Sequence, residues 1–512
     1  MPRTLCSHTE ILMNHPLRIH LTIIQPAGYI HSLGFLDQAR YLRHQFRRLG
    51  AEVSLSKNRL REDAVNFVFG AHLGFPAEWK SRNPCIFVNL EQLGEGGANV
   101  SPAYLALLKT SAAVDYDRAN VSAYTEDISS IPIIQFGYGA YLDKPGQIPL
   151  EERPIDLLFF GSMNQRRQRF IDRVEAAGGV VTIFGDPIYG PERDQFISQS
   201  KAVLNCHFYE TNRFEQARAF HSLSLGTPVI SERTRMTNPT AAFENAVIWL
   251  DDEDIASYFL KTFKQPAFYE EARACLSAFR VEDIEHDPLE AYAALLELAI
   301  GFQQVHSEGR SEEQWQPRAL NLGSGKDYKP NWLNVDILDR AEPDIVLDLG
   351  KPVSFPIAAP TRFGGKLLLN AESLDIIYAN NVLEHVPDLP ALMTNALTLL
   401  NEGGEFHIEV PYERALTAWQ DPTHLRALNE NSWLYYTSWF WYLGWFTHRF
   451  ELQELTWLDM SLQSCQQEQA AFMRVNLRKV VTTVRERNNA RVMQADFGGI
   501  DEDILFPATD NH

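Results

Sequence analysis

Short apolar runs alternate with segments of helical spacing in the N-terminal part of the chain, and this alternation leaves few possible folds. Residues 18–26 form a strand-like run, and residues 33–50 carry apolar side chains at helical spacing. A second alternation of the same kind begins at 154–162. Because strand–helix–strand units build parallel sheets covered by helices, we predict two α/β lobes, at about 17–145 and 146–300, with a cleft between them.

A third α/β unit follows a polar segment. Residues 301–317 lose the helical spacing, and we predict a linker there. The third unit is predicted over 318–485, and a polar, acidic tail over 486–512. Residues 1–16 are predicted as a leader outside the folded units. The predicted fold class is therefore α/β with three Rossmann-like units, a two-lobed N-terminal module and a separate C-terminal unit.

Composition and charge exclude several kinds of protein. The 512 residues carry a formal net charge of −20. Binding along a phosphate backbone needs a basic surface, so we predict no nucleic-acid partner. No apolar run reaches the ~20 residues of a membrane-spanning helix, so we predict no transmembrane segment. The start lacks the apolar core of a signal peptide, and the five cysteines are scattered, which favours reduced thiols in the cytoplasm.

The stretch LNLGSGKDYKPNWLNVDI, residues 320–337, predicts a strand, a glycine turn and a second strand that ends at Asp336. A dinucleotide fingerprint needs three glycines and an acid about 20 residues further on. Here only Gly323 and Gly325 are in place, and Asp336 comes early. A triphosphate loop ends in Gly-Lys-Ser or Gly-Lys-Thr, which GSGKDY lacks. Both kinds of ligand are therefore disfavoured at this turn.

Three further patterns follow this turn in order. Asp348 follows a third strand-like run, residues 373–386 are predicted as a fourth strand that enters a helix, and residues 398–412 as a helix, a glycine turn and a fifth strand. In this order the patterns resemble the class I S-adenosylmethionine-dependent methyltransferases, over about residues 318–480. The resemblance implies that the C-terminal unit has the seven-stranded methyltransferase sheet.

The resemblance also implies that S-adenosylmethionine is the cofactor. The glycines permit close backbone approach, Asp336 would accept hydrogen bonds from the ribose hydroxyls, and Asp348 would accept one from the adenine amino group. Many family members have an acid where this chain has Asn321, so contact with the amino group of the ligand is expected to be weaker here. The implied cofactor-binding residues are Gly323, Ser324, Gly325, Asp336, Asp348 and Asn380.

Methyl transfer mainly needs alignment of nucleophile, methyl group and sulfur, and a hydroxyl acceptor also benefits from a base. The candidate bases are His385 in NNVLEHV and His424 in DPTH. The DPTH stretch resembles one found in methyltransferases of bacterial surface-polysaccharide clusters, which favours a saccharide or glycolipid acceptor. Asp421 and His424 form our hypothetical base pair on the acceptor side. His385 alternatively packs beside the cofactor.

Residues 17–300 resemble the GT-B glycosyltransferases, which bind a nucleotide sugar between two lobes. The resemblance rests on IDLLFFGSMNQRRQRFI, YGPERDQFISQSKAVLNCHFY and RFEQARAFHSLSLGTPVISE. The strand end and helix start in FGSMNQRR offer free N–H groups and two arginines to a diphosphate. By resemblance a glutamate binds the donor ribose. The candidate nucleotide-sugar residues are Gly161, Arg166, Arg167, Glu215 and Glu232. Ordinary ion pairs on helix surfaces are the alternative role for these charges.

Two features of the N-terminal module stay open in the sequence. Ser32 and Gly34, at the first helix start, are expected to face the cleft, but the sequence names no catalytic base there. DYD at 115–117 is a chance-level match to the Asp-x-Asp metal motif, and we predict no metal site.

Three functions are compatible with these patterns. The first is a saccharide O-methyltransferase fused to a glycosyltransferase-like module in surface-polysaccharide biosynthesis. The second keeps the methyltransferase and makes the N-terminal lobes a non-catalytic glycan-binding scaffold. The third, a dinucleotide-dependent oxidoreductase, is disfavoured because the third glycine is missing. The sequence does not indicate an oligomeric state.

Overall fold

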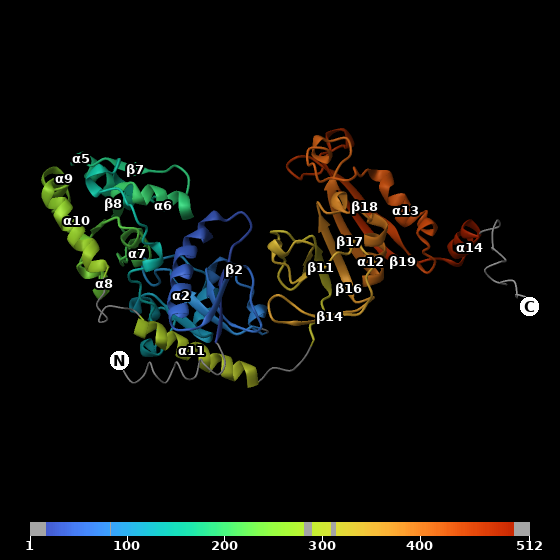
Figure 1. Cartoon of the computed structure of the whole chain (residues 1–512), viewed down its shortest axis with the longest axis horizontal. Coiled ribbons are helices and arrows are strands. Elements are labelled where there is room, and N and C mark those ends of the chain that lie inside the picture. Colours follow the sequence, from blue (N-terminus) through green and yellow to red (C-terminus); the bar gives the residue numbers. More distant parts are fainter. Residues whose placement is uncertain (1–16, 82, 281–288, 309–313, 496–512) are drawn as a thin grey trace, which may run out of the picture. The chain divides into compact units, whose positions relative to one another are not determined.

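The computed structural model describes residues 17–495 apart from 82, 281–288 and 309–313. The chain divides into two compact units, Met1–Arg310 and Ser311–His512. The first unit contains two five-stranded sheets, and the second contains a seven-stranded sheet and a two-stranded hairpin (Figure 1). The predicted fold class, α/β with three Rossmann-like sheets, is confirmed. The predicted leader lies outside the described residues.

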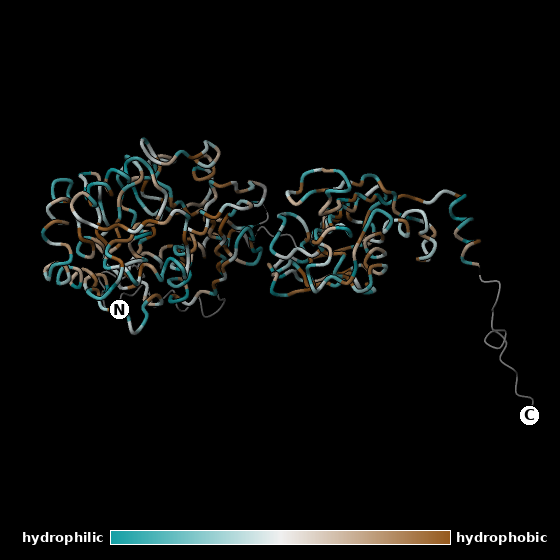
Figure 2. The backbone as a smooth tube through the Cα atoms, turned by 90° about the horizontal axis from the view of Figure 1, so that it is seen from above, coloured by the Kyte–Doolittle hydropathy of each residue, from teal (hydrophilic) through white to brown (hydrophobic). Residues whose placement is uncertain are grey.

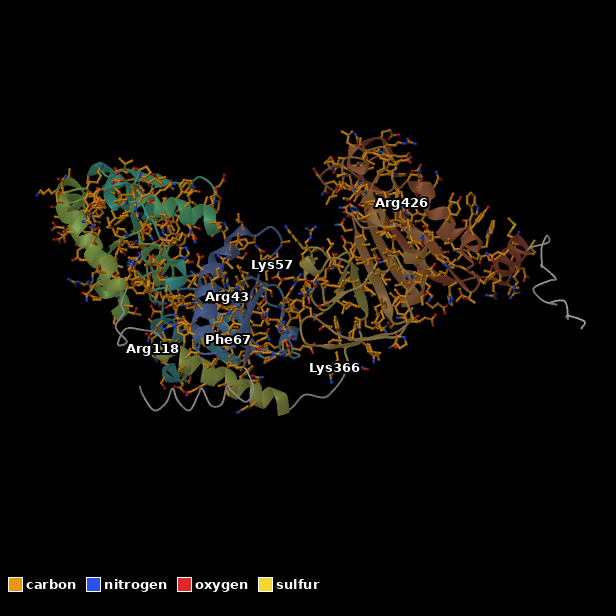
Figure 3. The ribbon with its side chains drawn as sticks, viewed as in Figure 1. Arg43, Lys57, Phe67, Arg118, Lys366 and Arg426 are labelled. Atoms are coloured by element: carbon orange, nitrogen blue, oxygen red, sulfur yellow. The ribbon has the colours of Figure 1, made fainter. Side chains whose placement is uncertain are left out.

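The first lobe is an all-parallel sheet with strand order β2-β1-β3-β4-β5. Its central strands are almost continuously apolar because helices cover both faces of such a sheet. Phe46 of α2 packs against Phe67 of β3, with ring centroids 5.1 Å apart. Phe67 is labelled in Figure 3. The main elements of this lobe are β1 (Arg18–Ile23), η1 (Ile30–Phe35), α2 (Leu36–Arg48), β2 (Glu52–Lys57), β3 (Val65–Phe69), β4 (Cys85–Asn89), α3 (Pro102–Thr110), β5 (Ala113–Asp115) and α4 (Arg118–Val121).

The second lobe is also all parallel, with strand order β10-β9-β8-β6-β7. Asn164 caps the helix that follows its first strand, because its side chain accepts a hydrogen bond from the N–H of Arg167. The elements are β6 (Ile155–Phe159), α5 (Gln165–Ala176), β7 (Val181–Ile183), α6 (Gly190–Ser198), β8 (Ser200–Asn205), α7 (Gln216–Ser224), β9 (Val229–Glu232), α8 (Ala241–Glu244), β10 (Ile248–Leu250), α9 (Ile255–Lys261) and α10 (Pro266–Phe279).

One hydrophobic core joins the two lobes. Tyr41 of α2 contacts Phe220 of α7, with ring centroids 4.9 Å apart, and Phe136 stacks on the same phenylalanine at 5.0 Å. The rings are buried and belong to one cluster that spans both lobes. Because α2 and α7 share this core, the two lobes hold the space between them in a defined geometry.

Helix α11 (Leu289–Glu308) packs on the first lobe. Two predicted boundaries are therefore wrong, the end of the second lobe at residue 300 and the start of the linker at residue 301. Tyr292 contacts Tyr41 at 6.0 Å between ring centroids, and its hydroxyl donates to the carbonyl of Gln135. The second lobe therefore does not extend to residue 300. The predicted linker, 301–317, is wrong in its first part, because the polar residues there continue the helix behind its buried start.

The second unit has the strand order β13-β12-β11-β16-β17-β19-β18, in which β19 runs in the direction opposite to the other strands. The predicted glycine turn within 398–412 is wrong, because Gly403 and Gly404 lie inside β17, beside a register shift. The strands are β11 (Ala319–Leu322), β12 (Leu333–Asp336), β13 (Ile345–Val346), β14 (Ile357–Pro360), β15 (Lys366–Leu369), β16 (Leu374–Asn380), β17 (Leu400–Pro411), β18 (His448–Leu458) and β19 (Phe472–Val481).

A loop rather than a helix connects the parallel strands β11 and β12. The N–H of Ser324 donates to the carbonyl of Val335, which continues the strand pairing into the loop. The side chain of Asn334 donates to the carbonyls of Lys329 and Trp332 at 2.9 Å each, and so satisfies backbone groups that a helix would satisfy internally. This loop leaves the carboxyl ends of the two strands close to each other.

The remaining helices of the second unit are short. They include η9 (Leu383–His385), α12 (Leu389–Leu399), α13 (Leu434–Thr437) and α14 (Val484–Gln494). Helix α14 starts with a capping box between Thr483 and Glu486, so the predicted tail over 486–512 is wrong in its first part.

Hydrophobic segments run through the interior of each unit (Figure 2). Over the described residues, none of the helices is long and apolar enough to cross a membrane.

Candidate functional site

The glycine turn after β11 forms the centre of the site in the second unit. Gly323 and Gly325 have positive φ angles, of 62° and 48°, which glycine adopts without strain. A Cβ on Gly323 would lie 2.4 Å from Cγ2 of Val382, so no larger residue fits there. Ser324 is buried between them, and its hydroxyl finds no hydrogen-bond partner among the described residues. The turn therefore has both the backbone freedom and the spare polar group expected of a ligand loop.

Asp336 ends β12 and orients this turn. Its Oδ2 accepts a hydrogen bond from the N–H of Gly325 at 2.8 Å, and its Oδ1 accepts one from the N–H of Leu338 at 2.8 Å. Each carboxylate oxygen can accept a further hydrogen bond. Ile337 follows directly and is 64% exposed, although it is a large apolar residue. A carboxylate and an apolar side chain thus lie side by side at the carboxyl end of the strand.

The other predicted cofactor residues have different surroundings. Asp348 lies in the turn after β13, where its Oδ1 accepts from the N–H of Gly350 at 2.9 Å and its Oδ2 pairs with Lys351 at 3.0 Å. Asn380 ends β16 and is exposed. Asn321 is buried, and its amide donates to the side chain of Asn334 at 3.0 Å. Asn321 is therefore a structural residue of the strand pair.

Two loops that follow neighbouring strands bring the histidines together. His385 follows β16, His424 follows β17, and their rings meet edge to face with centroids 4.8 Å apart. The N–H of Leu425 donates to the carbonyl of Glu384 at 2.8 Å, and Arg426 donates to the carbonyl of Pro387 at 2.8 Å, which ties the loops to each other. Arg426 is labelled in Figure 3. The two predicted bases, His385 and His424, therefore lie where the loops after β16 and β17 contact each other.

The predicted side-chain pair of Asp421 with His424 is not formed. The Oδ1 of Asp421 accepts hydrogen bonds from the N–H and the hydroxyl of Thr423, at 2.8 and 2.7 Å. The Nδ1 of His424 donates instead to the backbone carbonyl of Ala418 at 2.8 Å. Thr423, which Asp421 orients, lies 3.0 Å from Nδ1 of His385.

Sequence reasoning missed Glu384, the residue behind both histidines. Its side chain is 2% exposed, and neither carboxylate oxygen has a hydrogen-bond partner among the described residues. Nε2 of His424 lies 4.0 Å from Oε1 of Glu384. Burial raises the pKa of Glu384 above the ordinary value for a glutamate. The signal was adjacency to His385 in the sequence, but adjacency alone does not reveal burial.

The first unit contains a cleft of about 830 Å³ between its lobes. Arg167 and Glu215, both predicted, line it and form an ion pair. Arg218 lines it too, and its Nη2 lies 2.7 Å from Oε2 of the same glutamate, while its Nη1 has no partner among the described residues. Although burial alone would raise it, the charges of Arg218 and Arg167 hold the pKa of Glu215 below its usual value.

The remaining predicted residues of the cleft differ in position. Gly161 lines the wall with a φ of 128°, and a Cβ there would lie 2.7 Å from Nη2 of Arg218. Arg166 and Glu232 do not line the cleft; they form a bidentate pair, at 2.6 and 3.1 Å. Those two residues hold β9 against α5. Gly34 lines the cleft, and Ser32 is buried behind it.

Four further polar residues of the cleft were missed. Arg193 of the second lobe donates to Asp37 of the first at 2.6 Å, a buried pair that joins the lobes. On the opposite wall, Nε2 of His72 lies 3.5 Å from Oε1 of Glu91. Burial lowers the pKa of His72 to about 4, and burial together with Glu215 raises the pKa of Glu91 to about 6. A carboxyl group with a pKa near neutrality is suited to act as a general base.

Residues 282–458 match the protein family described as "Methyltransferase domain". The chain carries a methyltransferase domain. A search among curated proteins found no match to the chain. Similar solved structures include a SAM-dependent methyltransferase from Archaeoglobus fulgidus (14% identity, 36% of this chain, 93% of that chain, TM-score 0.21) and the YcgJ protein of Bacillus subtilis (12%, 32%, 91%, 0.22). HepE of Anabaena, solved with UDP and glucose, is also similar (13%, 56%, 100%, 0.37).

The candidate residues of the methyltransferase domain gather where its parallel strands end. Gly323 follows β11, Asp336 ends β12, Asn380 ends β16, and His385 and His424 follow β16 and β17. Because the carboxyl ends of parallel strands meet at one edge of a sheet, these residues share that edge. Ligands of open α/β sheets bind there.

Proposed function

We propose that the methyltransferase domain transfers a methyl group from S-adenosylmethionine to a saccharide hydroxyl. The observation that carries the proposal is the pairing of the glycine turn with the Asp336 carboxylate inside a methyltransferase domain. When bound, the cofactor supplies an electrophilic methyl group on a sulfonium centre. The residues of this chain need to hold the cofactor and to align the acceptor oxygen.

The glycine turn and the end of β12 fit an adenosyl group. Gly323 leaves the backbone uncovered, and Asp336 retains acceptor capacity for two ribose hydroxyls after its two backbone hydrogen bonds. The exposed Ile337 supplies an apolar surface for the adenine ring. Asp348 is held by its own turn and lies at the next strand end, where we assign it to the adenine amino group.

A saccharide acceptor is supported by the loop that carries His424. Trp419 lies five positions before this histidine, is 68% exposed, and is fixed by a hydrogen bond from its indole N–H to the carbonyl of Glu413 at 2.9 Å. A fixed, exposed indole face is suited to the apolar face of a sugar ring. The acceptor hydroxyl would then lie beside His385 and His424, and we assign both histidines to act on it.

The cleft of the first unit supports a second activity, the binding of a nucleotide sugar and transfer of its sugar. Arg167 and the unpartnered N–H of Arg218 offer positive charge to a diphosphate, and Glu215 lies between them. Glu91 is our candidate for the base that activates the acceptor. In such a two-module enzyme, the methyltransferase domain would act on the same glycan, in surface-polysaccharide biosynthesis. We place this enzyme in the cytoplasm, where both S-adenosylmethionine and nucleotide sugars are available.

The alternative keeps the methyltransferase domain and makes the lobes a glycan-binding scaffold. The two possibilities differ in ligand. Titration with UDP discriminates them: binding that Arg218→Met weakens at least tenfold supports the glycosyltransferase-like function. Glycan binding without UDP binding supports the scaffold.

Calorimetric titration with S-adenosylmethionine tests the methyltransferase proposal. Micromolar binding by the wild type and its loss in Asp336→Ala are expected, whereas Asp375→Ala, an exposed aspartate paired with Arg318, should bind as the wild type does. With glycan acceptors, His424→Ala should retain cofactor binding and lose methyl transfer. Absence of cofactor binding by folded wild type, or unchanged turnover in His424→Ala, would contradict the proposal.

A further inference from the structure

Glu384, His385 and His424 form a cluster of one carboxylate and two imidazole rings. One ligand atom from each lies within 4.8 Å of the others. The cluster is held from behind by the two tied loops, and Glu384 is its most buried member. Its two carboxylate oxygens find no donor among the described residues. A buried carboxylate without a donor costs several kcal/mol unless a cation compensates it.

The tautomers of both histidines follow from their neighbours. Nδ1 of His424 faces the carbonyl of Ala418, which only accepts, so the proton of this ring is on Nδ1. The hydroxyl hydrogen of Thr423 is directed to Asp421, at 2.7 Å. Thr423 therefore offers only acceptor oxygens to Nδ1 of His385, at 3.0 and 3.2 Å, and this ring also carries its proton on Nδ1. Both Nε2 atoms are left as lone-pair donors.

We propose that Glu384, His385 and His424 bind a divalent transition-metal ion. Two imidazole Nε2 atoms and one carboxylate are the ligand set of three-ligand zinc sites and of other open transition-metal sites, whereas Mg²⁺ prefers oxygen ligands alone. Backbone carbonyl and Thr423–Asp421 partners on the Nδ1 side match the outer hydrogen bonds that orient metal-bound histidines. Because ligand atoms around such an ion lie about 3–3.5 Å apart, binding would draw the cluster together by about 1 Å.

The metal gives the histidines their role in the proposed methyl transfer, and this step rests on that function. Three protein ligands leave coordination positions free for the acceptor hydroxyl, whose pKa a divalent ion lowers. The acceptor oxygen then forms the bond to the methyl carbon, the carbon–sulfur bond breaks with its electron pair going to sulfur, and the hydroxyl proton leaves to water at the exposed rim of His385. Neither histidine needs to act as the base itself.

The test measures metal binding without cofactor or acceptor. Full-length protein freed of metal by a chelator is titrated with Zn²⁺ and with Mn²⁺, and the bound metal is determined by elemental analysis. We expect about one ion per chain, and at least tenfold weaker binding for Glu384→Gln, His385→Ala and His424→Ala. His407→Ala is the matched control, because His407 pairs with Glu405 at 3.0 Å in β17, outside the cluster.

Folding is controlled separately, because Glu384 is buried. His385→Ala changes a partly exposed residue, and retention of S-adenosylmethionine binding shows that the domain is folded. Absence of stoichiometric binding by the wild type, or equal binding by folded His385→Ala, would overturn the proposal. Metal binding in a protein that lacks methyl transfer would leave the metal site standing and count against the proposed function alone. Methyl transfer that a chelator does not change, in a protein without bound metal, would overturn the metal site and leave the proposed function standing.

Discussion

Gly323 and Val382 lie so close together that a single added carbon atom cannot fit between them. A Cβ on Gly323 would be 2.4 Å from Cγ2 and 3.3 Å from Cγ1 of Val382, at a backbone φ of 62°. The contact joins the turn after β11 to the loop after β16. The loop that approaches the proposed acceptor is therefore packed directly against the proposed cofactor turn.

Gly323→Ala should destabilise the methyltransferase domain and weaken S-adenosylmethionine binding. The clash costs about 1–3 kcal/mol and the left-handed backbone about 1 kcal/mol more. Adding Val382→Ala removes the clash and should restore part of the loss, while the backbone strain remains. Thermal unfolding and cofactor titration of the single and double variants measure both parts.

Gly444→Ala is the control for backbone strain. Gly444 has a φ of 72°, and a Cβ there would meet nothing within 4 Å. Its cost should stay near 1 kcal/mol with unchanged cofactor affinity. Equal affinity for S-adenosylmethionine in Gly323→Ala and Gly444→Ala would show that the turn does not contact the cofactor.

Trp419→Ala should raise the KM for a saccharide acceptor and leave S-adenosylmethionine affinity unchanged. The indole is 68% exposed, so its removal costs the fold little, whereas loss of a sugar-stacking surface costs about 1–2 kcal/mol, or roughly tenfold in KM. Trp419→Phe should retain most of the affinity. Initial rates over a range of acceptor concentrations provide the measurement, and an unchanged KM in Trp419→Ala would place the acceptor elsewhere.

Arg167→Met should abolish UDP binding and destabilise the first unit. Removal of one partner from a buried ion pair costs about 3 kcal/mol, because Glu215 keeps only Arg218. Arg173→Met, on the exposed side of the same helix and paired with Asp252, should change neither property. UDP titration and denaturant unfolding of the two variants provide the comparison. A destabilised Arg167→Met that binds UDP normally would assign this arginine a purely structural role.

Much of the fold could be predicted from local patterns. Buried parallel strands such as Val65–Phe69 are mostly apolar, and Gly323 and Asp336 mark the ends of two strands, so the sheets and the glycine turn could be predicted from the sequence. The packing of α11 on the first lobe could not be predicted, because Tyr292 packs against Tyr41, a partner far away in the sequence. The polar residues after Phe302 hide the continuation of that helix from a sequence pattern.

The candidate site was predicted less completely, because its groups are assigned by tertiary contacts. Asp421 and His424 are close in the sequence, yet they do not pair. Nδ1 of His424 donates to the carbonyl of Ala418, and the Asp421 carboxylate accepts from the hydroxyl of Thr423. Glu384 became a candidate site residue only because the structure shows its carboxylate buried, with no hydrogen-bond donor among the described residues. Arg218 was within reach of sequence reasoning, since it lies three positions after Glu215 on α7.

The stability of the first unit should fall between pH 7 and pH 5 through His20 of β1. This side chain is buried; its Nε2 faces the carbonyl of Arg59 at 3.0 Å and its Nδ1 faces the hydroxyl of Ser54 at 2.7 Å. Burial lowers the pKa of His20 from 6.5 to about 4. The unfolded chain therefore binds the proton between these pH values and the folded chain does not, so stability decreases as pH falls, by about 2 kcal/mol from pH 7 to pH 5.

His20→Gln removes this titration while retaining a polar side chain. Wild type and variant are compared by hydrogen exchange of peptides from β1 and β3 at increasing denaturant, at each pH, so that intrinsic exchange rates cancel. The advantage of the wild type over His20→Gln should shrink by about 2 kcal/mol between pH 7 and pH 5, because protonation of His20 favours the unfolded chain. A difference that is the same at both pH values would mean that His20 keeps an ordinary pKa, and that the serine hydroxyls on β2 stabilise its charged form as well as its neutral form.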